Sequence, residues 1–145
     1  DLNIRPSLFD NHNKLRNTIY EYIRHANILK LSVEDLEFLG KEKHIYDLFV
    51  GDVEIIILTL GKEGCRCYLK NKEEIYCPGI EVESIDTTGA GDAFIGSFLY
   101  QLENLKSTEN FHNFLKFSNL YSAISVTRVG AIDSYITNEE MKRLI

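Results

Sequence analysis

The chain has 145 residues, of which 44% are hydrophobic and 26% charged, and its formal net charge is −6 at pH 7. This is an ordinary globular composition for about one domain, so we expect a single domain over residues 1–145. The negative charge argues against nucleic acid or an anionic membrane as the main partner. No apolar run approaches the ~20 residues of a membrane span.

The first part of the chain alternates short apolar runs with helical patterns. Residues 1–4 resemble the end of a strand, and residues 13–25 carry apolar side chains at helical spacing. Ser32 with Asp35 three residues later is a shortened capping-box pattern, which predicts a helix that Gly40 closes. The other elements expected before residue 61 are a buried strand at 26–31, a weak helix at 44–49 and a strand covered on both faces at 53–60.

The second part begins with a predicted hairpin, whose strands at 65–69 and 74–77 are joined across Asn71-Lys72. Helices follow at 89–103 and 109–126, and Asn138 is expected to cap a last helix that runs to Ile145. Strands that alternate with helices predict an α/β fold with three layers. The cysteines lie in strand-like segments without other metal ligands nearby, so we expect core thiols of a cytoplasmic protein at Cys65, Cys67 and Cys77.

The sequence DTTGAGDAF at residues 86–94 places a glycine pair at the start of a helical apolar pattern. Backbone N–H groups at a helix start that no Cβ blocks suit a phosphate or an oxyanion. Asp92 would lie in the first turn, where a carboxylate can take a proton from a nucleophile while the amides hold the group under attack. This combination points to phosphoryl transfer.

For the tetrapeptide GAGD alone, an ordinary loop in which Asp92 only complements the helix dipole stays open. Phe94 stands where a dinucleotide fingerprint needs its third glycine, and the chain has no P-loop.

The full string resembles the signature of the ribokinase-like (PfkB) family of carbohydrate kinases. The resemblance is to the C-terminal half of that family, and most of all to fructokinases. It implies a ribokinase-like α/β/α sandwich with a mostly parallel sheet, and an enzyme that uses ATP and Mg²⁺ to phosphorylate a sugar hydroxyl. It also implies that Asp92 is the catalytic base and that the amides of Gly89, Ala90 and Gly91 stabilise the transferred phosphoryl group.

The chain starts at Asp1 inside a strand-like string, so we expect a fragment of a longer sugar kinase that carries the nucleotide site and the base. Fructose is the first choice of acceptor. A 2-dehydro-3-deoxygluconate kinase, another sugar or nucleoside kinase of the family, and a non-catalytic nucleotide-binding relative stay open. The resemblance also leaves a homodimer of the full-length protein open.

Two further segments resemble nucleotide-binding parts of the family. The turn formed by Thr59, Gly61 and Gly64 matches T-x-G-x-x-G, which lies along the nucleotide, and ligands of open α/β sheets gather at the ends of strands. Asn119 matches the helix on the adenine side, although a solvent-exposed helical asparagine is the alternative.

The remaining candidates are substrate and metal residues. Residues 1–9 resemble the D-x-N-x-R-x-x-L-W/F segment of fructokinases and 2-dehydro-3-deoxygluconate kinases, so Asn3 and Arg5 join Asp92 as expected substrate contacts. Asp35 falls where the family has a carboxylate linked to Mg²⁺, and a helix cap is the equal alternative. The resemblance also suggests a monovalent-cation site, such as one for K⁺, formed mostly through backbone oxygens of Asp86, Thr88, Ser125, Gly130 and Ser134.

Overall fold

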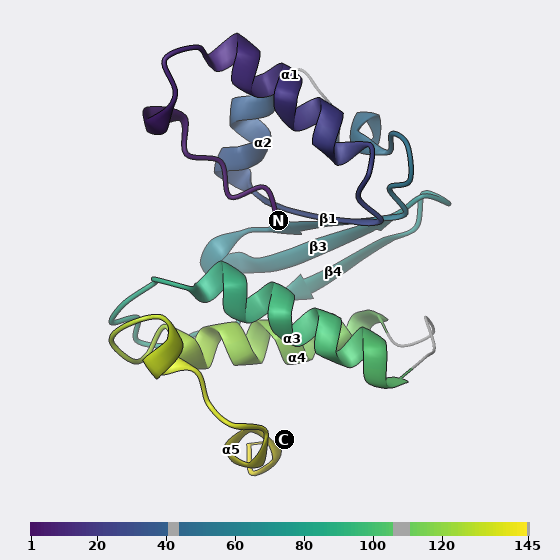
Figure 1. Cartoon of the computed structure of the whole chain (residues 1–145). Coiled ribbons are helices and arrows are strands. Elements are labelled where there is room, and N and C mark those ends of the chain that lie inside the picture. The colour runs from purple at the N-terminus through teal and green to yellow at the C-terminus, as the bar shows by residue number, and fades with distance from the viewer. Residues whose placement is uncertain (41–43, 106–110, 145) are drawn as a thin grey trace. The chain divides into compact units, whose positions relative to one another are not determined.

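The computed structural model describes residues 1–40, 44–105 and 111–144 (Figure 1). The described residues form two compact units. The first unit consists of Asp1–Leu60 with Arg66–Ile75, and the second of Gly61–Cys65 with Tyr76–Ile145. Each unit has buried residues of its own. The single domain expected from the sequence stays a prediction.

The first unit contains a pair of parallel strands, β1 (Ile28–Ser32) and β2 (Ile55–Thr59). The register places Ile28 opposite Ile55 and Ser32 opposite Thr59. In both strands the three central residues are all buried, so both faces of each strand are covered. This confirms the prediction from the continuous β-branched run, because a half-exposed strand would alternate buried and exposed side chains.

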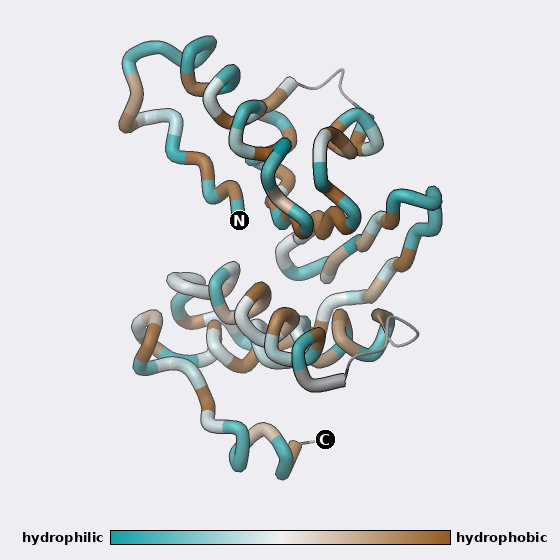
Figure 2. Tube along the Cα trace, turned by 45° about the vertical axis from the view of Figure 1, so that its right-hand side comes forward, coloured by the Kyte–Doolittle hydropathy of each residue, from teal (hydrophilic) through white to brown (hydrophobic). Residues whose placement is uncertain are grey.

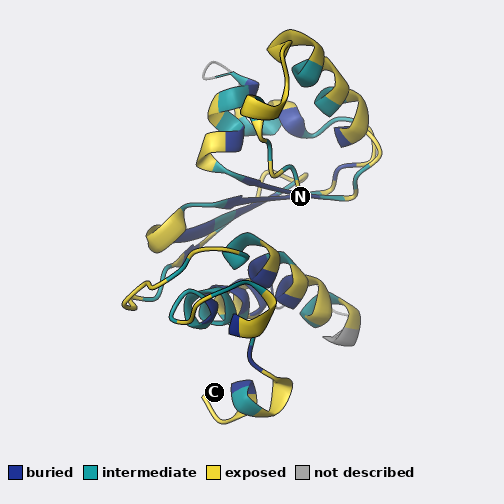
Figure 3. Cartoon of the chain, turned by 60° about the vertical axis from the view of Figure 1, so that its left-hand side comes forward, coloured by how far each residue is buried: buried dark blue, intermediate teal, exposed yellow. Residues whose placement is uncertain are grey.

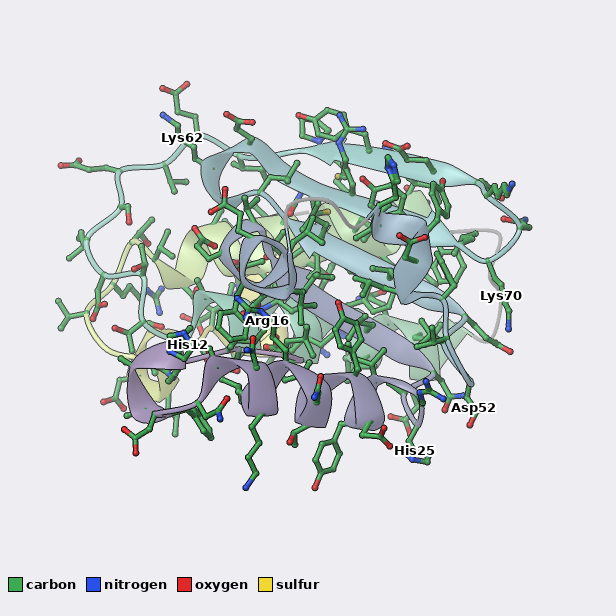
Figure 4. The ribbon with its side chains drawn as sticks, turned by 90° about the horizontal axis from the view of Figure 1, so that it is seen from above. His12, Arg16, His25, Asp52, Lys62 and Lys70 are labelled. Carbon is green, nitrogen blue, oxygen red and sulfur yellow. The ribbon has the colours of Figure 1, made fainter. Side chains whose placement is uncertain are left out.

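Two helices complete the first unit, α1 (His12–Ile23) and α2 (Val33–Leu39). Arg16 joins them, since its Nε donates to the Phe38 carbonyl at 2.7 Å and its guanidinium lies 4.6 Å from the centre of the Phe38 ring. Figure 4 shows Arg16 extending inward from α1. The core of this unit is made by Ile23, Leu29, Leu31, Leu39, Leu48, Val53, Ile56, Leu58 and Tyr68. The weak helix expected at 44–49 is a single 3-10 turn, Ile45–Leu48.

The predicted capping box at the start of α2 is present in full. Ser32 Oγ accepts the Asp35 N–H at 3.2 Å, and Asp35 Oδ2 accepts the Ser32 N–H at 2.9 Å. Gly40 ends the helix with a φ of 127°. The second carboxylate oxygen of Asp35 accepts the N–H of Ile4 at 2.8 Å, so this buried side chain also holds the N-terminal segment against α2.

The strand end expected at residues 1–4 is wrong. Residues 1–5 form no strand, although the Leu2 N–H donates to the Lys30 carbonyl of β1 at 3.0 Å. Asn3 then turns to a positive φ of 42°, which ends the extended conformation that pairing requires. Lys30 also holds this segment through Nζ, which lies 3.1 Å from the Asp1 carboxylate.

Strands β3 (Gly64–Leu69) and β4 (Glu74–Pro78) form the predicted hairpin. The Leu69 N–H donates to Glu73 O and the Lys72 N–H donates to Leu69 O, both at 2.9 Å. The four strands form one sheet in the order β1-β2-β3-β4, which is mixed because the hairpin is antiparallel. The predicted core thiols Cys65, Cys67 and Cys77 are all buried.

The second unit contains two long helices, α3 (Ala90–Leu105) and α4 (Phe111–Ser125), which run antiparallel and side by side in Figure 1. Their hydropathy alternates along the chain in Figure 2, and each has a buried and an exposed side in Figure 3. Phe98 packs against Phe111 and Phe114, with ring centroids 6.2 and 6.3 Å apart. Phe94 and Phe98 are buried, whereas Leu99 is 46% exposed.

The last helix, α5 (Asn138–Lys142), is capped by Thr137, so the predicted cap at Asn138 is wrong by one residue. Thr137 stands three residues before Glu140, and this spacing completes a capping box that Asn138 cannot form. The predicted helix ends at 109 and Ile145 lie outside the described residues. No helix in the described ranges is both long and apolar enough to cross a membrane.

Candidate active site

The turn before α3 is shaped by Gly89, which has a φ of 78°. Its carbonyl accepts two hydrogen bonds, one from the Ala93 N–H at 2.8 Å and one from the Tyr135 hydroxyl at 2.9 Å. A Cβ added to Gly89 would come within 2.7 Å of Tyr135 Oη and 3.0 Å of Ala131 Cβ. Glycine is therefore required here both for its backbone conformation and for space.

The backbone amides of this turn are the donors expected to hold an anion. Ala90 N–H donates to Thr87 O at 3.2 Å, so this group is already paired. Within the described residues, the N–H groups of Gly89, Gly91 and Asp92 have no acceptor. The structure therefore leaves two of the three predicted amides free and adds that of Asp92. These donors stand at the positive end of a helix of 16 residues.

The Asp92 side chain is exposed in the first turn of α3, as the sequence predicted. It borders a cavity of about 260 Å³ that is mainly apolar, and Tyr135 lines the same cavity. Burial raises the pKa of the Tyr135 hydroxyl, and the Asp92 charge adds to this shift. The aromatic residues of this cavity are Tyr100, Phe117, Tyr121 and Tyr135.

Asp86 joins the loop before α3 to the loop after α4. One carboxylate oxygen accepts the Thr88 N–H at 2.9 Å and the Thr88 hydroxyl at 2.6 Å, and the other accepts the Gly130 N–H at 2.9 Å. The N–H groups of Ile85 and Asp86 donate to Val126 O at 2.7 and 3.2 Å. The hydrogen bonds from Thr88 and Gly130 lower the pKa of Asp86 from 3.8 to about 2, the Thr88 hydroxyl contributing most.

The structure thus brings together Asp86, Thr88 and Gly130 of the predicted cation site. Ser125 and Ser134 belong to the same unit and are buried, and their hydroxyls donate to Ser122 O at 2.8 Å and Ala131 O at 2.6 Å. The described residues contain no group of three or more His, Cys, Asp or Glu that could hold a metal. A cation here would therefore rely on carbonyl and hydroxyl oxygens, the donor set that suits a hard ion.

The residues of the predicted T-x-G-x-x-G turn have different local roles. Thr59 ends β2, and its hydroxyl donates to the Leu31 carbonyl at 3.3 Å. Gly61 begins a 3-10 turn, Gly61–Glu63. Gly64 begins β3 with a φ of 99°, and a Cβ there would collide with the Cys77 carbonyl of β4. The close approach of the two strands therefore requires Gly64.

Asn119 lies on the buried side of α4 and is only 7% exposed, so the exposed-asparagine alternative is wrong. Its Nδ2 donates to Cys77 O at 3.2 Å and to Pro78 O at 3.1 Å. Asn119 thus joins α4 to the end of β4. Its expected contact with adenine stays a prediction.

The predicted sugar contacts Asn3 and Arg5 are both exposed and lie in the first unit. Arg5 precedes the 3-10 turn Pro6–Leu8, and its carbonyl accepts the Leu8 N–H at 3.1 Å. Asp35 belongs to the same unit, with both carboxylate oxygens accepting backbone N–H groups. The helix-cap interpretation of Asp35 therefore accounts for its contacts.

Sequence reasoning missed the Asp92 amide and the side chains of Ser122 and Tyr135. Ser122 Oγ donates to the Ala90 carbonyl at 2.9 Å. One signal pointed to it, since Ser118, Ser122 and Ser125 recur at helical spacing in α4, and small residues on one helix face allow a close approach of other backbone. No pattern in the sequence marks Tyr135.

Residues 1–138 match the family described as pfkB family carbohydrate kinase. The chain belongs to this family. Fructokinase-1 of Zea mays is 32% identical over 154 residues, which cover 100% of this chain and 47% of that protein. The chain thus spans about half the length of the curated relatives it matches.

Solved structures confirm the predicted ribokinase-like α/β fold. Fructokinase with bound ATP from Xylella fastidiosa matches with a TM-score of 0.88 at 25% identity, over 99% of this chain and 49% of that one. A fructokinase double mutant from Vibrio cholerae O395, in a form with bound fructose, ADP and potassium ion, matches with a TM-score of 0.84. It is 26% identical, over 97% of this chain and 47% of that one.

Proposed function

We propose that this chain carries the nucleotide-binding and proton-accepting part of an ATP-dependent sugar kinase, with fructose as the first acceptor. One observation supports this most strongly: unpaired amides of Gly89, Gly91 and Asp92 stand at the start of α3 together with the Asp92 carboxylate. A pure binding site for phosphate gains little from a carboxylate beside the anion. A phosphotransferase needs both groups at one place.

In this proposal Asp92 accepts the proton of the sugar hydroxyl as its oxygen attacks the γ-phosphorus of ATP. A new P–O bond forms to the sugar, the bond between the γ-phosphorus and the bridging oxygen breaks, and ADP leaves. The free amides would stabilise charge on the phosphoryl oxygens during transfer. Mg²⁺, when bound with the nucleotide, would neutralise phosphate charge.

Other residues are assigned by family membership and the contacts above. Thr59, Gly61, Gly64 and Asn119 are proposed for the nucleotide, and Asn3 and Arg5 for the sugar. The cation residues are proposed to bind K⁺ through carbonyl and hydroxyl oxygens, next to the turn that holds the amides. The Mg²⁺-linked role of Asp35 is the weaker of its two interpretations, because this carboxylate is 5% exposed and both oxygens accept N–H groups.

The kinase is proposed to act in the cytoplasm on small molecules, and a homodimer of the full-length protein stays part of the proposal. The alternative acceptor is 2-dehydro-3-deoxygluconate, since residues 1–9 resemble both kinds of kinase. Named relatives and solved neighbours that are fructokinases favour fructose.

The test compares Asp92→Asn with Glu103→Gln in the full-length enzyme. Both variants remove one exposed carboxylate from α3, but only the first removes the proposed base. We expect kcat with fructose to fall by about 10²–10⁴ in Asp92→Asn, with unchanged ATP affinity by isothermal titration, and no change in Glu103→Gln. Activity of Asp92→Asn within about threefold of the parent would refute the assignment. A parent that binds ATP but phosphorylates no member of a sugar panel would favour a non-catalytic relative.

A further inference from the structure

Two hydroxyl groups from outside the turn bind to successive carbonyls of the anion-binding loop. Tyr135 Oη donates to Gly89 O at 2.9 Å, and Ser122 Oγ donates to Ala90 O at 2.9 Å. Ser122 lies on α4, and Tyr135 follows the 3-10 turn Ile132–Ser134. Neither side chain is part of the glycine motif, and both belong to the same compact unit as the loop.

These two carbonyls control the orientation of the amides. A peptide group is planar, so a hydrogen bond to the carbonyl of one residue also fixes the N–H of the next. Ser122 therefore fixes the peptide that carries the Gly91 N–H, which is one of the free donors. Tyr135 fixes the preceding peptide, whose Ala90 N–H is held on its other side by Thr87 O at 3.2 Å.

Tyr135 is itself held firmly. Its ring lies 6.2 Å from that of Tyr121, and its backbone N–H donates to Ile132 O at 3.2 Å. The Tyr121 hydroxyl donates to the carbonyl of the neighbouring residue, Ile136, at 2.8 Å. Ile136 is 5% exposed, so the segment that presents the Tyr135 hydroxyl is anchored on both sides of it.

We propose that Tyr135 and Ser122 are positioning residues that preorganise the anion-binding amides for the transferred phosphoryl group. This inference rests on the proposed function. Neither hydroxyl touches the reacting atoms. The Ser122 hydroxyl removes freedom from the peptide that carries the free Gly91 N–H, and the Tyr135 hydroxyl holds the peptide that precedes it in the same turn. Donors already aimed at the developing charge need no reorganisation during the reaction.

The test uses single and double variants of the full-length enzyme, Tyr135→Phe and Ser122→Ala. The chain offers a matched control for each. Tyr46→Phe also removes a tyrosine hydroxyl bound to a backbone carbonyl, that of Lys72 at 3.4 Å, and Ser118→Ala removes a serine hydroxyl that donates to Phe114 O at 2.8 Å. Neither control hydroxyl contacts the loop. Each control variant nevertheless loses a hydrogen bond from a hydroxyl to a backbone carbonyl, as each test variant does.

Two readouts separate positioning from stability. The first readout compares the change in kcat with the change in the KM for ATP. The second compares the affinity for ADP plus aluminium fluoride with the affinity for ADP alone, because aluminium fluoride mimics the phosphoryl group in transfer. We expect kcat and aluminium-fluoride affinity to fall together by about 3–10-fold in each single variant and about 10–100-fold in the double variant. KM for ATP and the affinity for ADP should change less than twofold.

Both controls should keep the parent kcat, with unfolding midpoints that match those of the test variants. Test variants that keep the parent kcat and the parent preference for the mimic would overturn the inference. Equal losses in the test and control variants would also overturn it, because they would reflect packing alone. A failure of the proposed function would be seen differently, because the parent enzyme would then phosphorylate no sugar. In that case the ratio of the two ADP affinities would still decide the role of the hydroxyls.

Discussion

Replacing Gly89 by alanine is the sharpest test of the turn geometry. The new methyl group would stand on a backbone with a φ of 78°, 2.7 Å from Tyr135 Oη, 3.0 Å from Ala131 Cβ and 3.2 Å from Ala131 Cα. The tyrosine ring is packed against Tyr121, and one of the three close atoms belongs to the backbone. None of these neighbours is the free end of a flexible side chain.

The magnitude follows from three contributions to the free energy of unfolding. A left-handed conformation costs an alanine about 1–2 kcal/mol. Overpacking at a tight site costs about 1–3 kcal/mol. The lower entropy of the unfolded chain offsets about 0.4–1 kcal/mol of this. We therefore expect Gly89→Ala to destabilise the protein by ~1–5 kcal/mol.

Gly96→Ala is the matched control, because it makes the same change inside α3, the helix that follows the Gly89 turn. A Cβ at Gly96 meets nothing within 4 Å, and its φ is not positive. This variant should be more stable than the parent by about 0.4–1 kcal/mol. Urea unfolding of the two variants, followed by circular dichroism, measures the difference. A Gly89→Ala protein as stable as Gly96→Ala would refute the argument for this turn.

Two further predictions concern the Asp86 loop. The carboxyl pKa is lowered from 3.8 to about 2 in the folded protein, so its stabilisation is present above pH 3.8 and is lost as the pH falls through about 2. In the parent, the free energy of unfolding should therefore fall between about pH 3.8 and pH 2, and this fall should be smaller in Asp86→Asn. The same dependence of this free energy on pH in parent and variant would contradict the prediction. If K⁺ binds here, sugar phosphorylation should rise when K⁺ replaces a bulky organic cation at constant ionic strength. A flat response across cations would remove the site.

The elements that the sequence predicted correctly are those whose cause is local. The α2 capping box depends on two side chains three residues apart, and the covered β2 strand on a continuous run of branched apolar residues. The hairpin depends on a four-residue connection that permits only a tight turn. In each case the residues that decide the structure are neighbours in the chain, so pattern and propensity suffice.

The errors arose where a distant contact decides. Residues 1–4 have a strand-like composition, but whether they pair depends on β1, and the backbone turns at Asn3 after the Leu2 amide has bonded to it. Asn119 was placed on a helix correctly, but its burial depends on the end of β4, more than 40 residues away, where Cys77 and Pro78 offer two carbonyls to one amide. Helical periodicity predicts on which side of a helix a residue lies, but it does not predict which segment packs against that side.

The same reasoning applies to the glycine motif, which predicted the groups of the turn better than their hydrogen bonds. The motif identifies glycines, a helix start and a carboxylate, so it predicts backbone amides near the Asp92 side chain. Which amides are free depends on the turn itself, where Thr87 pairs with Ala90 and the amides of Gly89, Gly91 and Asp92 find no acceptor among the described residues. Their orientation is held by hydroxyls from residues 122 and 135, which no motif includes. The orientation of these amides therefore depends on the packing of α4 and of the segment after it.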